Sequence, residues 1–166
     1  MNLHQRKNIR LKNYDYSQCN AYFITICTYN RANLFKKAIV GSHLCVRPND
    51  IDPSKAIIFK WLNELEHKYQ NLIIDEFVIM PDHIHFIIFN LGVNNKGVHI
   101  GTPLPEIIKW FKTQTTNDYI KLVKRGKLPP FDKHIWQRNY YEHIIRNTKD
   151  YEKICKYIYE NPLKCD

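Results

Sequence analysis

Hydrophobic positions along the chain follow two spacings, and the first of them predicts four strands. Residues 21–30, "AYFITICTYN", are rich in the β-branched and aromatic side chains that strands favour. Residues 72–80 and 83–91, "LIIDEFVIM" and "HIHFIIFNL", are apolar runs joined through a Pro-Asp pair, which indicates a hairpin of two buried strands. Residues 139–146, "NYYEHIIR", follow a basic, proline-containing connection and predict the fourth strand.

The second spacing places apolar side chains three or four residues apart and predicts helices. Residues 52–71 show it after a Pro-Ser start, which is typical of a helix N-terminus. Another helix is predicted to begin near Pro103 and to run through Arg125. Residues 91–103 are rich in glycine and asparagine and predict a loop. The side of the second helix that should face the core comprises Ile107, Ile108, Phe111, Thr115 and Tyr119.

A third helix is predicted near the C-terminus. It begins at a cap on Asn147 or Thr148, and it ends at Asn161 because the residue before a proline is pushed out of helical geometry. The side expected to pack on the sheet comprises Tyr151, Ile154 and Ile158.

The predicted order of elements is β-α-β-β-α-β-α. Four strands and two crossover helices in this order predict an α+β fold, the ferredoxin-like split βαβ arrangement with a four-stranded antiparallel sheet, and the third helix is added to it. A chain of 166 residues suits one hydrophobic core, so we expect a single domain over residues 1–166. A basic arm covers roughly the first 20 residues.

Charge and cysteine content narrow the class of protein. The sequence has 25 Lys and Arg against 16 Asp and Glu, a net charge of +9, which suits a polyanionic partner such as nucleic acid. The five cysteines are scattered and form no Cys-x-x-Cys pair, so neither a disulfide framework nor a thiolate zinc site is expected. No apolar run is long enough for a membrane span or a signal peptide. We therefore expect a cytoplasmic protein with no membrane partner.

Two histidines stand at the start of the second strand of the hairpin. His83 and His85 are two residues apart, so their side chains point to the same face of a strand, while Ile84 and Phe86 point to the other. Two imidazoles on one face can bind one cation. The alternative is that both rings only complete hydrogen bonds at a sheet surface.

A metal site needs more than two histidines, and the C-terminal helix offers candidate groups. Tyr157 and Asn161 are four residues apart, one helical turn, so a tyrosine hydroxyl and an amide oxygen would be neighbours on one surface. Tyr151 and Tyr159 are explained as well by core packing or by exposed rings.

These segments together resemble a known family. "MPDHIHFII" and "IWQRNYYEHIIRNTKDYEKICKYIYENPLK" are similar to the REP-associated tyrosine transposases, which are relatives of the insertion-sequence-200 transposases within the HUH single-strand nucleases. HUH denotes histidine, hydrophobic residue, histidine, here His83-Ile84-His85. The similarity also includes the basic arm and the helical segment "LPEIIKWFKTQTT".

The resemblance implies a site and a reaction. His83, His85 and Asn161 would be the ligands of a divalent metal, Mg²⁺ or Mn²⁺, and Mn²⁺ suits two imidazoles better. Tyr157 would attack single-stranded DNA at or beside a hairpin from a palindromic repeat and keep the 5′ end as a phosphotyrosine. Related transposases pair as dimers, so monomer and homodimer both remain open. Many relatives continue past the position where this sequence ends, after "NPLKCD", and the two expected alternatives are weaker substrate discrimination or a more open active site.

Single-strand recognition needs cations along the backbone and flat rings for unstacked bases. For each lysine the alternative is a solvated surface, and for the tryptophan it is the core. The expected DNA-binding residues are Arg6, Lys7, Arg10, Lys12, Lys124, Arg125, Trp136, Arg138 and Arg146.

Two readings of function from the sequence compete. The first is a metal-dependent single-stranded DNA endonuclease and strand transferase, a transposase. The second is a catalytically inactive nucleic-acid-binding module of the same fold, in which the histidines are vestigial. A histidine-metal hydrolase of small molecules is disfavoured, because the sequence shows no further clustered acidic or histidine ligands and the chain is basic.

Overall fold

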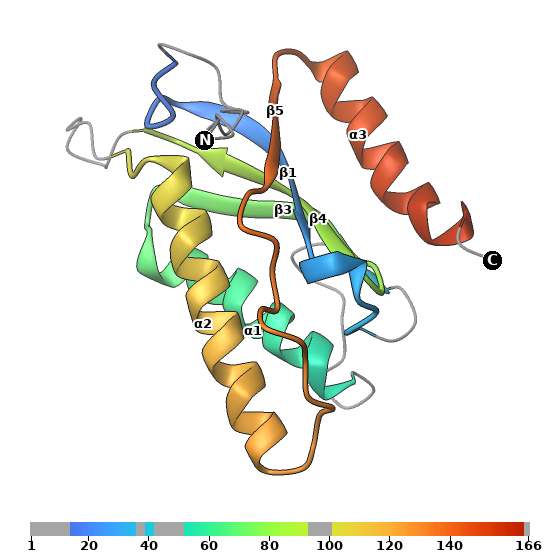
Figure 1. The fold of residues 1–166 in the computed structure, drawn as a ribbon. Helices are drawn as coiled ribbons and strands as arrows, with labels where there is room; N and C mark the ends of the chain where they lie inside the picture. Colours follow the sequence, from blue (N-terminus) through green and yellow to red (C-terminus); the bar gives the residue numbers. More distant parts are fainter. Residues whose placement is uncertain (1–13, 36–38, 42–51, 93–100, 165–166) are drawn as a thin grey trace, which may run out of the picture.

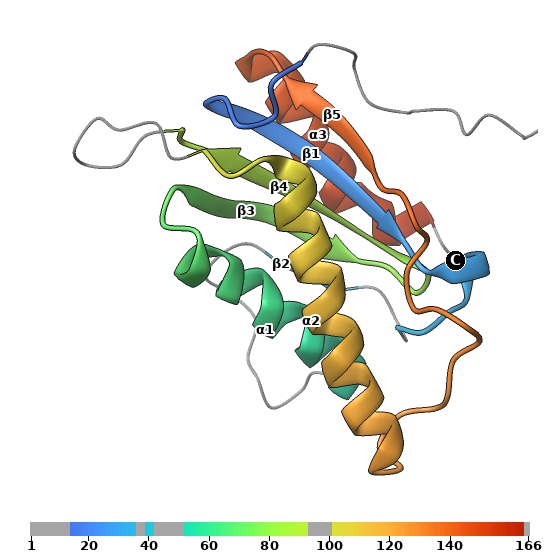
Figure 2. The same cartoon turned by 60° about the vertical axis from the view of Figure 1, so that its left-hand side comes forward.

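An antiparallel sheet with helices on both faces forms the centre of the molecule (Figure 1). The computed structural model describes residues 14–35, 39–41, 52–92 and 101–164. Two helices cover one face of the sheet and the C-terminal helix covers the other, which Figure 2 shows from the side. The described part of the chain thus has three layers, with a larger apolar core on the two-helix face.

The sheet has five strands in the order β2-β3-β4-β1-β5, and every pair of neighbours is antiparallel. Without β2, the order β3-β4-β1-β5 is that of the ferredoxin-like split βαβ arrangement, so the predicted fold class is confirmed. The strands are β1 (Asn20–Cys27), β2 (Ile39–Gly41), β3 (Leu72–Ile79), β4 (His83–Asn90) and β5 (Tyr141–Ile145).

The prediction of four strands was wrong by one. Strand β2 has three residues and pairs only with β3 at the edge of the sheet. A segment this short carries no measurable alternation of apolar and polar positions, so nothing in its sequence distinguishes it from a loop.

Helices α1 (Pro53–Lys68) and α2 (Leu104–Lys124) pack on the same face. The Asp52 side chain accepts a hydrogen bond from the backbone N–H of Ser54 and caps α1. The buried side of α2 is the predicted one, with Leu104 added to it. None of the helices in the described part of the chain is long and apolar enough to cross a lipid bilayer.

Helix α3 (Thr148–Glu160) lies alone on the opposite face. Asn147 caps it by accepting a hydrogen bond from the N–H of Asp150 at 2.9 Å, and Asn161 follows its last turn, as predicted. Its apolar residues Ile154 and Ile158 pack in a second core cluster with Val78, Met80, Ile87 and Ile145. A small apolar contact therefore holds the tyrosine-bearing helix on the sheet.

Ile158 is fully buried in this contact, so its truncation tests how strongly α3 is held. We expect Ile158→Ala to lower the free energy of unfolding by about 2–5 kcal/mol, because it removes buried methyl groups and leaves a cavity. Urea denaturation followed by circular dichroism measures the change. Ile73→Ala, at a position 44% exposed on β3, is the control and should change stability by no more than about 0.5 kcal/mol. An equal loss of unfolding free energy in both variants would contradict the inference that Ile158 holds α3 on the sheet.

Candidate functional site

The two histidines lie on the α3 face of β4, as their spacing predicts. Ile84 and Phe86 point into the core beneath α1 and α2, whereas His83 and His85 share the other face with Ile87. The centroids of the two imidazole rings are 4.6 Å apart, and the rings are inclined by 77°. This separation allows both rings to reach one ion.

Each imidazole is held through its Nδ1 atom. The Nδ1 of His85 is 2.8 Å from the Thr25 hydroxyl, and the Nδ1 of His83 is 2.5 Å from a carboxylate oxygen of Asp82. Asp82 is held in turn by Arg31, at 3.2 Å. If both Nδ1 atoms donate to these oxygens, both Nε2 atoms keep a free lone pair, which is the tautomer that a metal ligand requires.

The environment of the site keeps His85 neutral. Burial, with smaller contributions from the electrostatic interactions with His83 and Arg31, lowers the pKa of His85 to about 3. Burial would raise the pKa of Asp82, but its hydrogen bonds and charge interactions with His83 and Arg31 outweigh this effect and lower it. At neutral pH the site therefore combines an uncharged imidazole with an ionised carboxylate next to the other ring.

Helix α3 brings Tyr157 to this pair. The Tyr157 hydroxyl is 3.4 Å from the Nε2 of His85, and the two ring centroids are 5.3 Å apart. Phe23 stacks on His85 at 5.1 Å and meets the edge of Tyr157 at 5.9 Å, so it fills the space beneath both. Tyr157 is 41% exposed, so the residue is accessible from solvent. The structure thus brings together a residue from β4 and one from α3 that are 72 positions apart.

The other two tyrosines of α3 bond to carboxylates instead. The Tyr151 hydroxyl donates a hydrogen bond of 2.6 Å to Asp75, and this bond raises the pKa of Tyr151. Tyr159 is hydrogen-bonded to Glu76, which raises its pKa as well. Both partners lie on β3, whereas the histidines lie on β4. Of the three tyrosines on this helix, Tyr157 is the one in contact with His85.

Asn161 lies directly after α3 and is 8% exposed. Its backbone N–H donates to the carbonyl oxygen of Tyr157, which fixes it one turn beyond the tyrosine. Among the residues that the structure describes, no group of three or more histidine, cysteine, aspartate or glutamate side chains could hold a metal ion. A metal on His83 and His85 therefore needs a ligand of another kind, and an amide oxygen qualifies.

The structure also contains site residues that sequence reasoning missed. Phe23, Thr25 and Asp82 all contact the histidines, but the sequence analysis singled out none of them. Asp82 could have been found, since it directly precedes His83 in a turn. Thr25 could not, because its position opposite His85 is set by the pairing of β1 with β4.

The predicted DNA-binding residues are scattered over the molecule, and the prediction for Trp136 was wrong. Trp136 is only 6% exposed, and its indole N–H donates to the Thr115 hydroxyl at 2.9 Å, so the ring is held in the core and does not form an open stacking surface. Four of the predicted DNA-binding residues are exposed. They lie at the end of α2, in the α2–β5 connection and before α3, and are Lys124, Arg125, Arg138 and Arg146. The members that lie outside the described residues are Arg6, Lys7, Arg10 and Lys12.

Comparison with known proteins identifies a matching family and similar sequences. The family model described as "Transposase IS200 like" matches residues 15–161. An uncharacterised protein of Haemophilus influenzae is 34% identical over 175 residues, which cover 97% of this chain and 90% of that protein. The REP-associated tyrosine transposase of Escherichia coli K12 is 59% identical over 32 residues, 19% of each chain.

A solved structure shares the fold. The REP-associated tyrosine transposase bound to a REP hairpin superposes with a TM-score of 0.62 at 21% identity, over 96% of this chain and 74% of that one. The family model over residues 15–161 confirms the family resemblance seen in the sequence motifs. The chain belongs to the IS200-like transposase family, whose tyrosine transposases are DNA-cleaving enzymes.

Proposed function

We propose that this protein is a metal-dependent single-stranded DNA endonuclease and strand transferase that uses Tyr157 as its nucleophile. The observation that carries the proposal is the 3.4 Å contact between the Tyr157 hydroxyl and the Nε2 of His85. A nucleophile needs to lie where the reacting phosphate can be held, and a ligand pair next to it supplies that position.

The donor set fits a divalent cation. The imidazole of His85 contacts Tyr157, the imidazole of His83 lies next to that of His85, and the buried side chain of Asn161 is the proposed third ligand. Two nitrogen ligands favour Mn²⁺ over Mg²⁺ on chemical grounds. A bound cation would polarise the scissile phosphate and offset the charge that develops on it during attack.

The covalent step follows from the position of the hydroxyl. The oxygen of Tyr157 attacks phosphorus and loses its proton, the bond from phosphorus to the 3′ oxygen breaks, and the 3′ end leaves as a hydroxyl after gaining a proton. The 5′ end stays on Tyr157 as a phosphotyrosine diester. Attack by another 3′ hydroxyl reverses the step and joins strands, so strand transfer needs no ATP.

Hairpin DNA is the proposed substrate. The solved transposase that shares this fold is bound to a REP hairpin, and the net charge of +9 suits a phosphate backbone. The competing proposal, an inactive module of the same fold, lacks a specific observation in its favour, because the histidines, their Nδ1 partners and the tyrosine are brought together.

The nucleophile is tested by Tyr157→Phe, which keeps the ring against Phe23 and removes the attacking oxygen. We expect a folded protein that binds a hairpin oligonucleotide and forms no covalent adduct. The measurement is a denaturing gel with DNA labelled at its 3′ end, since that fragment would remain attached to the protein. Tyr159→Phe is the matched control and should still form the adduct. Mass spectrometry that places the phosphotyrosine on Tyr159, Tyr140 or Tyr141 would refute the assignment.

The ligand pair is tested by His83→Ala and His85→Ala. Both variants should lose cleavage while hairpin affinity stays nearly unchanged, because affinity comes mainly from cations that contact the backbone. The two quantities are measured separately, by the cleavage gel and by fluorescence anisotropy. Cleavage at the original rate by the double variant would exclude a metal role for the pair.

Thr25→Val tests the hydrogen bond that orients His85. Loss of a partner behind a metal-ligating histidine typically weakens metal affinity by about 10- to 100-fold, and we expect a loss of this size for Mn²⁺. Isothermal titration with Mn²⁺ measures it in the absence of DNA. Thr25→Ser retains the hydroxyl and should restore most of the affinity. If valine and serine behave alike, the hydroxyl does not orient the ring.

A further inference from the structure

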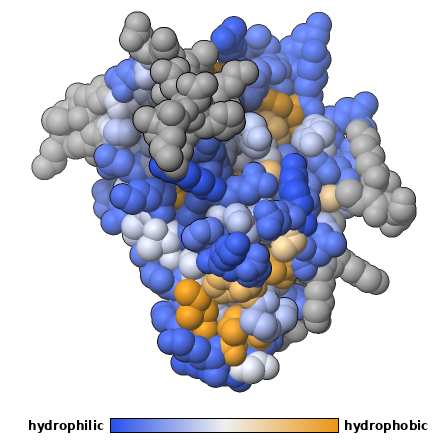
Figure 3. Space-filling model, in the orientation of Figure 1, coloured by the Kyte–Doolittle hydropathy of each residue, from blue (hydrophilic) through white to orange (hydrophobic). Residues whose placement is uncertain are grey.

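Helix α3 is held on the sheet by polar bonds as well as by its apolar residues. Ile154 and Ile158 are the two buried residues of this helix, and the side chains visible over it in the space-filling view are mostly hydrophilic (Figure 3). Apolar contacts are not directional, so a contact made by two residues leaves the helix some freedom to roll about its axis. Hydrogen bonds restrict such a roll, because they require particular distances and angles.

The first of these bonds joins α3 to β3. The Tyr151 hydroxyl donates to a carboxylate oxygen of Asp75 at 2.6 Å, a length typical of a hydroxyl bonded to a carboxylate. Strand β3 has one extra residue at this point of its pairing with β4, so Asp75 and Glu76 both lie opposite Ile87. A bulge of this kind re-aims side chains, and here it directs two consecutive carboxylates toward α3.

The second bond joins α3 to β5, on the other side of the histidines. A carboxylate oxygen of Asp150, the residue before Tyr151, is 2.9 Å from the Nε2 of His143. His143 pairs with Phe23 of β1, which stacks on His85, so the His143 side chain lies on the α3 face of β5. Strands β3 and β5 are separated in the sheet by β4 and β1. The two bonds therefore form a clamp that holds the start of α3 across the sheet.

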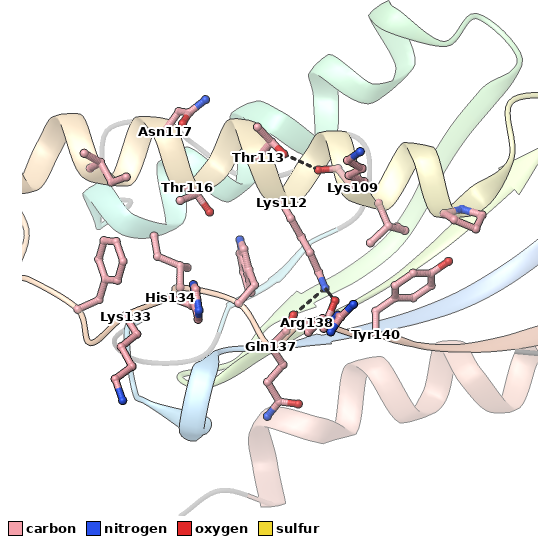
Figure 4. Close-up of a pocket in the computed structure, with 16 residues that line it drawn as sticks. Lys109, Lys112, Thr113, Thr116, Asn117, Lys133, His134, Gln137, Arg138 and Tyr140 are labelled. Carbon is pink, nitrogen blue, oxygen red and sulfur yellow. Dashed lines mark hydrogen bonds between the residues drawn. The ribbon is translucent and has the colours of Figure 1, made fainter. Parts of the chain in front are cut away.

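The path of the chain into β5 is itself fixed. Lys112 reaches from α2 to the segment of residues 131–140, which leads to this strand (Figure 4). Its ammonium group donates to the backbone carbonyl oxygens of Gln137 and Asn139, each at 2.9 Å. His143 therefore stands on a strand whose approach is tied to the main core, which gives the clamp a fixed end on β5.

The clamp determines the direction in which Tyr157 points. Tyr157 is six residues beyond Tyr151, or about 9 Å along the helix axis. At about 100° per residue, it lies on the same side of the helix as Asp150 and about 120° away from Tyr151. A roll that lengthens the bond from Tyr151 to Asp75 therefore also moves the Tyr157 hydroxyl, which is 3.4 Å from the Nε2 of His85.

We propose that the clamp positions Tyr157 for attack on DNA. Asp75 and His143 are thus positioning residues, which act on the nucleophile through α3. A misplacement of about 1 Å can lower a reaction rate by about 100-fold, so bonds remote from the reacting atoms can control the reaction. The inference rests on the proposed function, since it takes Tyr157 as the nucleophile.

The contact between Tyr157 and His85 reports the position of α3 without DNA or metal. The measurement is the nuclear Overhauser effect between protons of the two rings, whose centroids are 5.3 Å apart, in the presence of EDTA. We expect Asp75→Leu to weaken this effect, because it removes the acceptor. Asp75→Asn should preserve it, because an amide oxygen also accepts a hydrogen bond from Tyr151. An unchanged effect in Asp75→Leu, or equal losses in the leucine and asparagine variants, would overturn the proposal.

The single-turnover rate of covalent adduct formation tests the consequence for the reaction. Tyr151→Phe keeps the ring that packs on Phe89 and removes the donor, so we expect a rate lower by about 10- to 100-fold. Hairpin affinity should stay nearly unchanged, since it comes mainly from backbone-binding cations. The double variant with Asp75→Leu should be no slower than the slower single variant, because both changes remove the same bond. Losses that multiply would contradict a shared role in the clamp.

The β5 side of the clamp is tested by His143→Ala, which should also slow adduct formation. His143→Gln offers an amide N–H to Asp150 and should restore most of the rate. Tyr159→Phe is the matched control. The Tyr159 ring is 52% exposed, so loss of its hydroxyl should change the rate by no more than about twofold. An unchanged rate in His143→Ala, or a loss in Tyr159→Phe as large as that in Tyr151→Phe, would overturn the proposal.

The two proposals fail separately. If the contact between the Tyr157 and His85 rings depends on Asp75 but the unsubstituted protein forms no adduct, the clamp stands and the endonuclease does not. If Asp75→Leu forms the adduct at the rate of the unsubstituted protein, the endonuclease stands and the clamp does not.

Discussion

The packing of α3 on the sheet is the contact on which the site depends. Ile154 and Ile158 pack this helix on the sheet, and the helix brings Tyr157 to His85. One helical turn advances the chain by about 5.4 Å, so a slip by one turn would take the hydroxyl well beyond contact with the imidazole. A few buried methyl groups therefore help to set the distance between the Tyr157 hydroxyl and the His85 imidazole, the proposed nucleophile and the proposed ligand.

Strand β4 meets two demands at once. Its residues on one face complete the main core, and those on the other carry the two imidazoles. A buried imidazole costs little free energy only when it is neutral and its nitrogen atoms have partners. The Thr25 hydroxyl provides such a partner for His85, and the same neutral state leaves a lone pair available to a cation. The neutral, hydrogen-bonded state of His85 thus suits both its burial and the binding of a cation.

The sequence predicts those parts of the structure that are encoded locally. The common face of His83 and His85 follows from alternation along one strand, and the limits of α3 follow from Asn147 and from the proline after Asn161. Features that depend on distant partners were missed or misread. Thr25 meets His85 across 60 positions, and Trp136 is drawn into the core by Thr115, 21 positions away. The three-residue strand β2 is too short to leave a pattern at all.

The carboxylates of β3 affect which tyrosine a DNA strand can meet. Tyr151 and Tyr159 lie on either side of Tyr157 along α3, and each is bonded to an acidic side chain, Asp75 or Glu76. A raised pKa makes the Tyr151 and Tyr159 hydroxyls harder to ionise. Under the proposed reaction, the hydrogen bonds from Tyr151 and Tyr159 to β3 therefore disfavour attachment of DNA to these two tyrosines.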